Sequence, residues 1–273
     1  MPRRKPVALT IAGSDPGGGA GIQADLKTFH QFGAYGEAAI TLITVQNTRA
    51  FERLECLPAD LVADQIRAVI GDIPPDAAKT GALGNRAIIE AIADLARAFD
   101  FPLVVDPVLT TKHGGVFLPD DAIAAFKKDL IPHAYLLTPN LEEAALLTDL
   151  KVCSLDDMHR AAQVLQAMGA RAVLIKGGHL SGGPTDLLLY DGQFIEFSGE
   201  RIDTRHTHGT GCTLSAAITA LLAQGRELPD AVRIAKRYVT EAIRTNPGLG
   251  QGAGPLNHHA PAQPRLASAD PGE

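Results

Sequence analysis

The sequence has 273 residues, of which 45% are hydrophobic and 21% are charged, a balance that indicates a globular chain and excludes a disordered or fibrous one. Its net charge of −6 and its lack of a basic stripe argue against nucleic-acid binding. No apolar run approaches the ~20 residues that a membrane span needs. Three cysteines without CxxC spacing argue against a disulfide framework and favour a reducing, cytoplasmic location.

Short apolar runs alternate along the chain with helix-like segments. Strands are expected over residues 7–12, 38–45, 77–80, 103–105, 134–137 and 172–175, and helices over residues 20–32, 58–70, 86–98, 141–147, 155–168, 208–222 and 229–245. Because most strands are apolar throughout, both faces of the sheet should be covered by helices, as in an α/β fold with a mainly parallel sheet.

Asp191-Gly192 lies between two strand-like runs, 187–190 and 193–197, and predicts a hairpin that adds a small antiparallel edge to the sheet. No internal repeat and no long linker divides the chain. We therefore expect a single domain over residues 1–254, followed by a disordered tail over residues 255–273.

Most of the polar clusters in the sequence stand where an expected strand ends. These clusters are residues 13–19, 46–47, 79–81, 106–107, 138–143 and 176–179. In open α/β sheets, ligands bind beyond the carboxyl ends of the strands. The coincidence of these positions predicts an active-site rim along that edge of the sheet.

The sharpest local motif is residues 208–213, His-Gly-Thr-Gly-Cys-Thr, which opens an apolar helix. Small residues at a helix start leave backbone N–H groups free, and with the helix dipole these groups form an anion site. Cys212 in this turn is a candidate base or nucleophile, because a helix N-terminus lowers the pKa of a thiol. The alternative is a tight turn that holds a buried, inert cysteine.

Other phosphate and polar-ligand motifs in the sequence are less specific. No lysine directly follows a glycine, which excludes a Walker loop. The glycine-rich segment 13–21 is either a phosphate or ligand loop or only a turn after the first strand. Asp25, on the helix that follows, either faces a polar ligand or is solvated.

Three further strand ends carry charged groups. Glu143, in the Asn140-Leu141-Glu142-Glu143 motif, either holds Mg²⁺ through water or complements the helix dipole. Asp106 is either a metal or base position or part of a turn. Lys176 is either a phosphate-binding cation or a loop lysine.

Taken together, these motifs resemble a known enzyme family. The matching segments are residues 10–28, 45–48 (Val-Gln-Asn-Thr), 106–108 (Asp-Pro-Val), 138–144, 176–179 and 207–215, in this order. They resemble the hydroxymethylpyrimidine/phosphomethylpyrimidine kinases of thiamine biosynthesis, which belong to the ribokinase-like sugar and vitamin kinases. The resemblance extends over roughly residues 8–254.

The resemblance implies a ribokinase-like α/β domain and an activity. That activity is the ATP-dependent phosphorylation of 4-amino-5-hydroxymethyl-2-methylpyrimidine, followed by phosphorylation of the monophosphate to the diphosphate. The implied cofactors are ATP and Mg²⁺, the implied location is the cytoplasm, and the implied assembly is a homodimer that acts on small molecules, without nucleic acid or membrane.

The resemblance also implies roles for individual residues. The base is Cys212, in a position where sugar kinases carry Asp, and the anion hole comprises Gly209, Thr210 and Gly211. The pyrimidine pocket comprises Gln46, Asp25, Gly13, Val108 and Ala82. The nucleotide site comprises Lys176, Thr213 and Asn140, and the metal site comprises Glu143 and Asp106.

Two departures from the family pattern concern the pocket. Ala82 stands where many relatives have Met, which predicts a larger pocket, and the segment 110–115 differs from the usual sequence of a mobile flap. Three rival functions remain at this point. They are a pyridoxal kinase from the same family, which the Gln46-Asn47 pair disfavours; a ligand-binding protein without catalysis; and a thiol-redox protein that uses Cys212.

Overall fold

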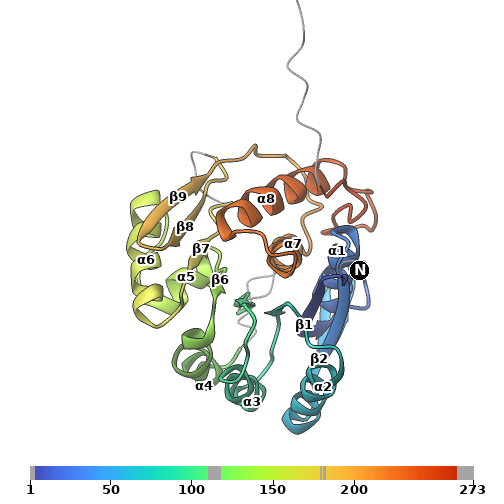
Figure 1. Cartoon of the computed structure of the whole chain (residues 1–273). Coiled ribbons are helices and arrows are strands. Elements are labelled where there is room, and N and C mark those ends of the chain that lie inside the picture. Colours follow the sequence, from blue (N-terminus) through green and yellow to red (C-terminus); the bar gives the residue numbers. More distant parts are fainter. Residues whose placement is uncertain (1–3, 110–117, 179, 181–182, 263–273) are drawn as a thin grey trace, which may run out of the picture.

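The computed structural model describes residues 4–109, 118–178, 180 and 183–262 (Figure 1). Within these residues the chain builds one nine-stranded sheet with the strand order β3-β2-β1-β4-β5-β6-β7-β8-β9. Figure 1 shows helices on both faces of the sheet, so the expected three-layer α/β fold is confirmed. No helix of the described residues is long and apolar enough to cross a membrane.

The strands pair in a parallel centre with antiparallel edges. The six strands of the parallel part are β1 (Val7–Ser14), β2 (Tyr35–Gln46), β4 (Ala77–Thr80), β5 (Leu103–Val105), β6 (Leu136–Leu137) and β7 (Val173–Ile175). The expected hairpin is confirmed as β8 (Asp186–Tyr190) and β9 (Gln193–Phe197). A second antiparallel edge, β3 (Phe51–Cys56), was not predicted, because charged residues interrupt this exposed strand and leave no apolar run.

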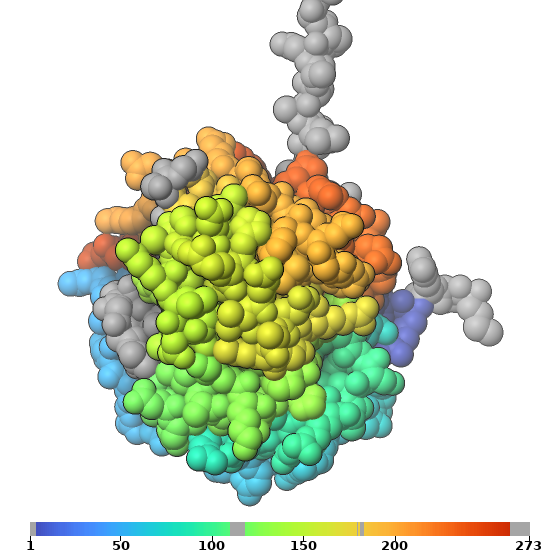
Figure 2. Space-filling model, turned by 90° about the vertical axis from the view of Figure 1, so that its left-hand side faces the viewer, coloured from blue at the N-terminus to red at the C-terminus, as the bar shows by residue number. Residues whose placement is uncertain are grey.

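The helices divide between the two faces of the sheet. One face packs against α1 (Gly21–Gln31), α7 (Thr210–Ala223) and α8 (Leu228–Arg244). The other packs against α2 (Ala59–Asp72), α3 (Arg86–Ala96), α4 (Asp120–Ala125), α5 (Leu141–Thr148) and α6 (Leu155–Ala167). Figure 2 shows part of that second layer, green to yellow, at the surface of the molecule.

Strand β5 illustrates how the sequence builds both layers. Val104 packs in the cluster of α7 and α8, whereas its neighbours Leu103 and Val105 pack in the cluster of α2 to α6. Successive side chains of a strand point to opposite faces, so a strand buried on both faces has to be apolar throughout. Helix α7 is likewise buried on all sides, because every residue from Thr213 to Ala223 is buried.

The strand order creates a switch point between β1 and β4. From β1 the chain moves to β2 and β3 on one side, and it then returns to place β4 on the other side of β1. The carboxyl ends of two strands that diverge in this way leave a crevice for a ligand. The glycine loop after β1 and the Lys79-Thr80-Gly81 segment at the end of β4 both lie at this switch point.

The chain remains packed beyond residue 254. Leu256 and Ala260 are buried against α7 and α8, and the side-chain amide of Gln31 donates to the carbonyl of Ala260 at 2.8 Å. The predicted disordered tail therefore begins too early, because apolar residues at 256 and 260 reach the core. Residues 263–273 lie outside the described residues, and their disorder stays a prediction.

Candidate active site

Helix α7 begins in a turn that only glycine can form. Gly209 is the N-cap and has a φ of 81°, in the left-handed region. A Cβ atom at this position would lie 1.8 Å from the carbonyl oxygen of Gly19. The N–H groups of Gly211 and Cys212 follow within the first helical turn, where the helix offers no acceptor. The turn therefore presents the backbone donors that an anion hole requires.

A lysine lies directly beside this turn. A Cβ atom at Gly211 would lie 3.2 Å from Nζ of Lys176, and Nζ is 2.9 Å from Oδ1 of Asp106. Burial alone would lower the pKa of Lys176, but the negative charges of Asp106 and Glu143 more than offset this and raise it. Lys176 is therefore a permanent cation next to the free N–H groups of α7.

Asp106 anchors this lysine. Its carboxylate accepts hydrogen bonds from Thr138 Oγ1 at 3.1 Å and from Ser215 Oγ at 3.2 Å, in addition to Lys176. Burial raises its pKa, yet the charges of Lys176 and Lys79 outweigh burial and hold the pKa below its usual range. The structure thus brings Asp106 and Lys176 together, as the shared sheet edge predicts.

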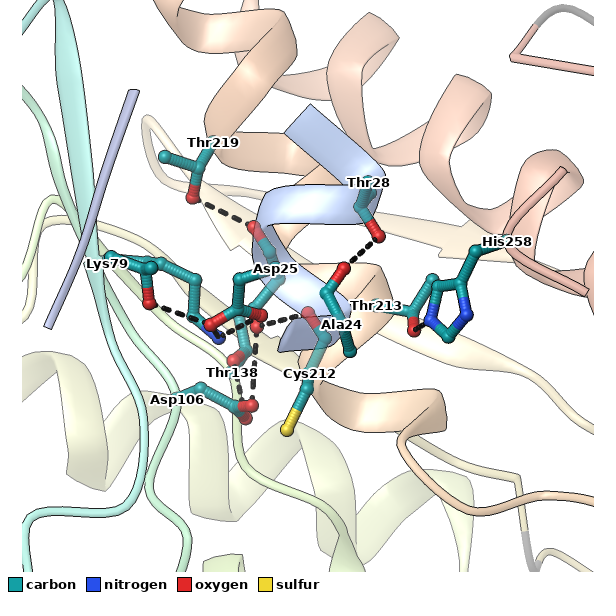
Figure 3. A network of polar contacts seen from close by, with 12 residues as sticks. Ala24, Asp25, Thr28, Lys79, Asp106, Thr138, Cys212, Thr213, Thr219 and His258 are labelled. Carbon is teal, nitrogen blue, oxygen red and sulfur yellow. Dashed lines mark hydrogen bonds and ion pairs between the residues drawn. The ribbon is translucent and has the colours of Figure 1, made fainter. Parts of the chain in front are cut away.

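A second lysine–aspartate pair lies deeper in the switch point (Figure 3). Lys79 and Asp25 are both fully buried, with Nζ at 2.9 and 3.0 Å from the two carboxylate oxygens. Thr10 Oγ1 also donates to Asp25 at 2.6 Å. Burial alone would lower the pKa of Lys79, but the charges of Asp25, Cys212 and Asp106 raise it.

The predicted role of Asp25 in the pyrimidine pocket is therefore not supported. Helix α1 turns this residue toward the sheet, where both of its oxygens are engaged and its side chain is 0% exposed. Asp25 is the counterion of Lys79. Its pKa is raised by burial in spite of that lysine.

The glycine loop after β1 is internally satisfied. Asp15 accepts hydrogen bonds from the backbone amides of Gly17 at 2.8 Å, Gly19 at 3.0 Å and Ala20 at 2.9 Å. The amide of Gly18 donates to the Asp15 carbonyl at 3.0 Å. These four backbone amides are therefore not available to bind a phosphate. For this part of the loop the structure supports a turn after the first strand and not a phosphate-binding loop.

Cys212 is partly exposed in the first turn of α7. Burial raises the pKa of its thiol to about 11, although Lys79 and the amide of Gly21 pull it down. The expectation that the helix N-terminus lowers this pKa is wrong for this structure, because desolvation exceeds the combined effect of the dipole and the lysine. The thiol is therefore protonated at neutral pH.

Asn140 and Glu143 form a capping box at the start of α5. The Asn140 side chain accepts from the Glu143 amide, and Oε2 of Glu143 accepts from the Asn140 amide, both at 2.8 Å. Burial raises the pKa of Glu143 to about 7 despite the charge of Lys176. The capping box gives Glu143 a structural role at the start of α5, and its predicted role in metal binding stays a prediction.

The described residues contain no cluster of three or more His, Cys, Asp or Glu side chains that is ready to hold a metal ion. The carboxylate of Asp106 is already engaged by Lys176, Thr138 and Ser215. Glu143 fits Mg²⁺ as a single carboxylate that acts through water, since this ion keeps several waters when it binds with phosphates.

The residues expected around the pyrimidine lie along the ends of β1, β2 and β4. A Cβ atom at Gly13 would lie 3.6 Å from Cβ of Ala82, so these two residues are neighbours. Gln46 ends β2 and donates to Thr44 Oγ1 at 3.0 Å, and Thr44 in turn donates to the Ser14 carbonyl at 2.9 Å. Val108 is partly exposed just after β5, two residues beyond Asp106.

Thr213 points into the protein. Its side chain is fully buried, and its Oγ1 lies 3.3 Å from Nε2 of His258 (Figure 3). Its amide closes the first helical bond to Gly209 at 2.8 Å. The burial of Thr213 indicates a packing role, and its predicted nucleotide contact stays a prediction. The expected flap at 110–115 and His179 lie outside the described residues.

The sequence reasoning missed the roles of Lys79, Asp15 and Ser215. For Lys79 the sequence contains a signal, because this lysine lies in a short strand of small residues, Ala-Ala-Lys-Thr. The structure buries the whole strand, and a buried lysine requires a partner of opposite charge. Ser215 gives no such signal, because a serine is ordinary in the first turns of a helix. Its bond to Asp106 appears only when α7 is packed on β5.

Comparison with known proteins decides the family. The family model described as phosphomethylpyrimidine kinase matches residues 15–257. The chain belongs to this family. The hydroxymethylpyrimidine/phosphomethylpyrimidine kinase of Streptomyces coelicolor is 46% identical over 257 residues, which are 94% of this chain and 96% of that protein.

Solved structures agree with this membership. The phosphomethylpyrimidine kinase of Clostridium difficile 630 is 44% identical with a TM-score of 0.79, and the match covers 88% of this chain and all of that one. The pyridoxal kinase of Staphylococcus aureus in complex with AMP-PCP is 37% identical with a TM-score of 0.87, and the match covers 94% of both chains. The expectations of a ribokinase-like fold and of a phosphotransferase are confirmed, and as a kinase the chain uses ATP.

The buried pair gives a stability prediction. Asp25→Asn leaves the charge of Lys79 uncompensated in the core, so we expect a loss of about 3–5 kcal/mol in the free energy of unfolding, measured in urea. The matched control is Asp64→Asn, which removes the exposed ion pair with Arg67. The control should lose less than about 1 kcal/mol. Equal losses in the two variants would contradict the account.

Proposed function

We propose that this chain phosphorylates 4-amino-5-hydroxymethyl-2-methylpyrimidine with ATP, and then phosphorylates the resulting monophosphate to the diphosphate, in thiamine biosynthesis. One observation supports this proposal most strongly. The glycine turn of α7, the cation of Lys176 and the thiol of Cys212 lie close together at the carboxyl edge of the sheet. Phosphoryl transfer needs this combination of positioned donors, positive charge and a proton acceptor.

In the proposed reaction the hydroxymethyl oxygen attacks the γ-phosphorus of ATP. The new oxygen–phosphorus bond forms as the bond to the β-phosphate oxygen breaks, and ADP leaves. The amides of Gly211 and Cys212 and the ammonium of Lys176 stabilise the charge of the transferring group. The hydroxyl proton passes to the sulfur of Cys212, which must be a thiolate to accept it.

Lys79 favours the thiolate form of Cys212. Lys79 lowers the pKa of Cys212, while the nearby charges of Asp25 and Asp106 raise it. With a pKa of about 11, only a small fraction of the free enzyme carries the thiolate at pH 7. The rate should therefore follow the thiolate fraction as the pH rises.

Mg²⁺ belongs to the proposal, with Glu143 as the residue that holds it through water beside the nucleotide phosphates. When bound, the ion would neutralise phosphate charge. Asn140 then acts through its cap, which fixes the orientation of Glu143. A cytoplasmic location, a homodimeric assembly and the absence of a nucleic-acid partner complete the proposal, the last supported by a net charge of −6.

The choice between pyrimidine and pyridoxal depends on the pocket edge. The amide of Gln46 can donate and accept at once, which suits an aminopyrimidine edge. Ala82 next to Gly13 leaves room where a larger side chain would fill the pocket. Pyridoxal kinase is the second candidate, because the pyridoxal kinase of Staphylococcus aureus shares this fold over 94% of the chain.

Product identification tests the proposal. The purified protein is incubated with Mg·ATP and separately with the hydroxymethylpyrimidine, its monophosphate or pyridoxal, and products are identified by mass. Monophosphate and diphosphate of the pyrimidine are expected. Phosphorylation of pyridoxal alone would contradict the proposal and identify the protein as a pyridoxal kinase of vitamin B6 salvage.

Gln46→Leu tests the pocket edge. Because leucine has nearly the same size but no polar atoms, the KM for the pyrimidine should rise by tenfold or more, about 1.4 kcal/mol, while the KM for ATP stays within about twofold. Steady-state kinetics with each substrate varied in turn measures both constants. Equal increases in the two constants would show that Gln46 acts only on the structure.

Cys212→Ala tests the base. Turnover should fall by about 10²- to 10⁴-fold, the range of a general base, with little loss of nucleotide binding. In the unaltered enzyme, log(kcat/KM) should rise by about one unit per pH unit between pH 7 and 9, because the thiolate fraction grows tenfold per unit below the pKa.

The control for this variant is Cys153→Ala, which removes an exposed thiol and should leave both the rate and its pH profile unchanged. Unchanged turnover in Cys212→Ala would remove Cys212 from the chemistry. A flat pH profile with a large loss in Cys212→Ala would assign the thiol to substrate positioning instead.

A further inference from the structure

The glycine loop is joined to the turn of α7 by one side-chain pair. Nε2 of His208 lies 3.1 Å from Oδ2 of Asp15, although the two residues are 193 positions apart. A carboxylate only accepts hydrogen bonds, so His208 is the donor. Asp15 is 3% exposed and His208 is 22% exposed at the side chain, so this bond forms largely away from water.

Asp15 is the shared acceptor of this junction. Its Oδ2 accepts the amides of Gly19 and Ala20 as well as the His208 ring. Burial raises the pKa of Asp15, but hydrogen bonds from His208 and from the amides of Gly17 and Ala20 outweigh burial and hold it below its usual value. The carboxylate is therefore ionised at neutral pH and holds the last part of the loop and the first part of the turn at once.

The two backbones approach each other closely at this junction. A Cβ atom at Gly209 would lie 1.8 Å from the Gly19 oxygen, and a Cβ atom at Gly19 would lie 2.8 Å from Cδ2 of His208. A third segment backs the turn, because the His208 amide donates to the Gly254 carbonyl at 3.1 Å. His208 is thus held between the glycine loop and the segment that follows α8.

The loop ends at the reacting group. Gly21, the first residue of α1, follows directly after Ala20, whose amide Asp15 holds. Cys212 lies in the first turn of α7, shortly after the Gly209 backbone that packs against the Gly19 carbonyl. A displacement of the loop relative to the turn would therefore disturb the backbone around the thiol and admit water to it.

We propose that Asp15 and His208 are a positioning pair that fixes the glycine loop on the α7 turn and thereby keeps the backbone around the Cys212 thiol in place. This proposal rests on the kinase function proposed above. In this proposal Asp15 and His208 have no direct role in the reaction. They act through the loop, so their loss reduces turnover and leaves nucleotide affinity nearly intact.

The test compares two substitutions of similar size. His208→Gln keeps an N–H donor for Asp15, whereas His208→Leu keeps the packing against Gly19 and removes the donor. The control is His30→Leu, on an exposed residue near the end of α1. Two readouts are taken: kcat and the KM for ATP, and the rate at which iodoacetamide alkylates Cys212, followed by mass with exposed Cys153 as the internal reference.

In His208→Leu we expect kcat to fall on the order of 10- to 100-fold with the KM for ATP within about twofold. Alkylation of Cys212 relative to Cys153 should become at least about threefold faster, because the released loop hydrates the thiol and moves its pKa back toward the value of free cysteine. His208→Gln should restore most of both properties. His30→Leu should match the unaltered enzyme.

Equal behaviour of His208→Leu and His208→Gln would overturn the proposal, and so would a fall in kcat with unchanged alkylation of Cys212. Should His208→Leu fail to fold, Asp15→Asn removes the charge that the histidine pairs with, and the same alkylation change is required of it. The alkylation readout needs no substrate. It therefore decides this proposal even if the protein phosphorylates neither pyrimidine nor pyridoxal.

Discussion

The site depends on two lysines held by aspartates at the carboxyl edge of a buried sheet. Lys79 with Asp25 and Lys176 with Asp106 place positive charge where water is scarce, and each pair draws further hydrogen bonds from Thr10, Thr138 or Ser215. A buried ion pair contributes little to stability by itself, since desolvation offsets attraction. Its value here is electrostatic, because a preorganised cation needs no rearrangement when charge develops in the reaction.

The same dry environment makes the thiol of Cys212 a weak acid. Burial opposes the lysines and the helix terminus, and the pKa settles at about 11. A fully solvated thiol would ionise more readily, but in the proposed reaction it would also admit water to the γ-phosphoryl group. Under that proposal the site favours exclusion of water over a high resting concentration of thiolate, and it depends on positioned donors to recover the rate.

Much of the fold follows from the sequence, because fully apolar strands and amphipathic helices reveal themselves by their patterns. Strand β3 was not predicted because it is exposed and charged. The packing of the segment after residue 254 was not predicted because two apolar side chains among Gly, Pro and His do not make a periodic pattern. The sequence predicted site residues from the polar motifs at the carboxyl ends of the strands. The direction of a side chain is a tertiary property, so Asp25 and Thr213 were placed at the ligand and proved to be buried in the protein. Lys79 was visible as a charge in an apolar strand, but its partner was not.

The segment after α8 affects the order in which the parts of the structure can form during synthesis. Residues 255–262 lie against α7 and α8. The carbonyl of His258 accepts a hydrogen bond from the Tyr238 hydroxyl, and the His258 ring contacts Thr213. Just before this segment, the Gly254 carbonyl accepts the amide of His208, which precedes the glycine turn. Synthesis proceeds from the N-terminus, so the whole sheet leaves the ribosome before this segment does. A nascent chain therefore holds a nearly complete core while the backbone support of its catalytic turn is still missing. The turn of α7 therefore gains this backbone support only after the strands of the sheet have been made.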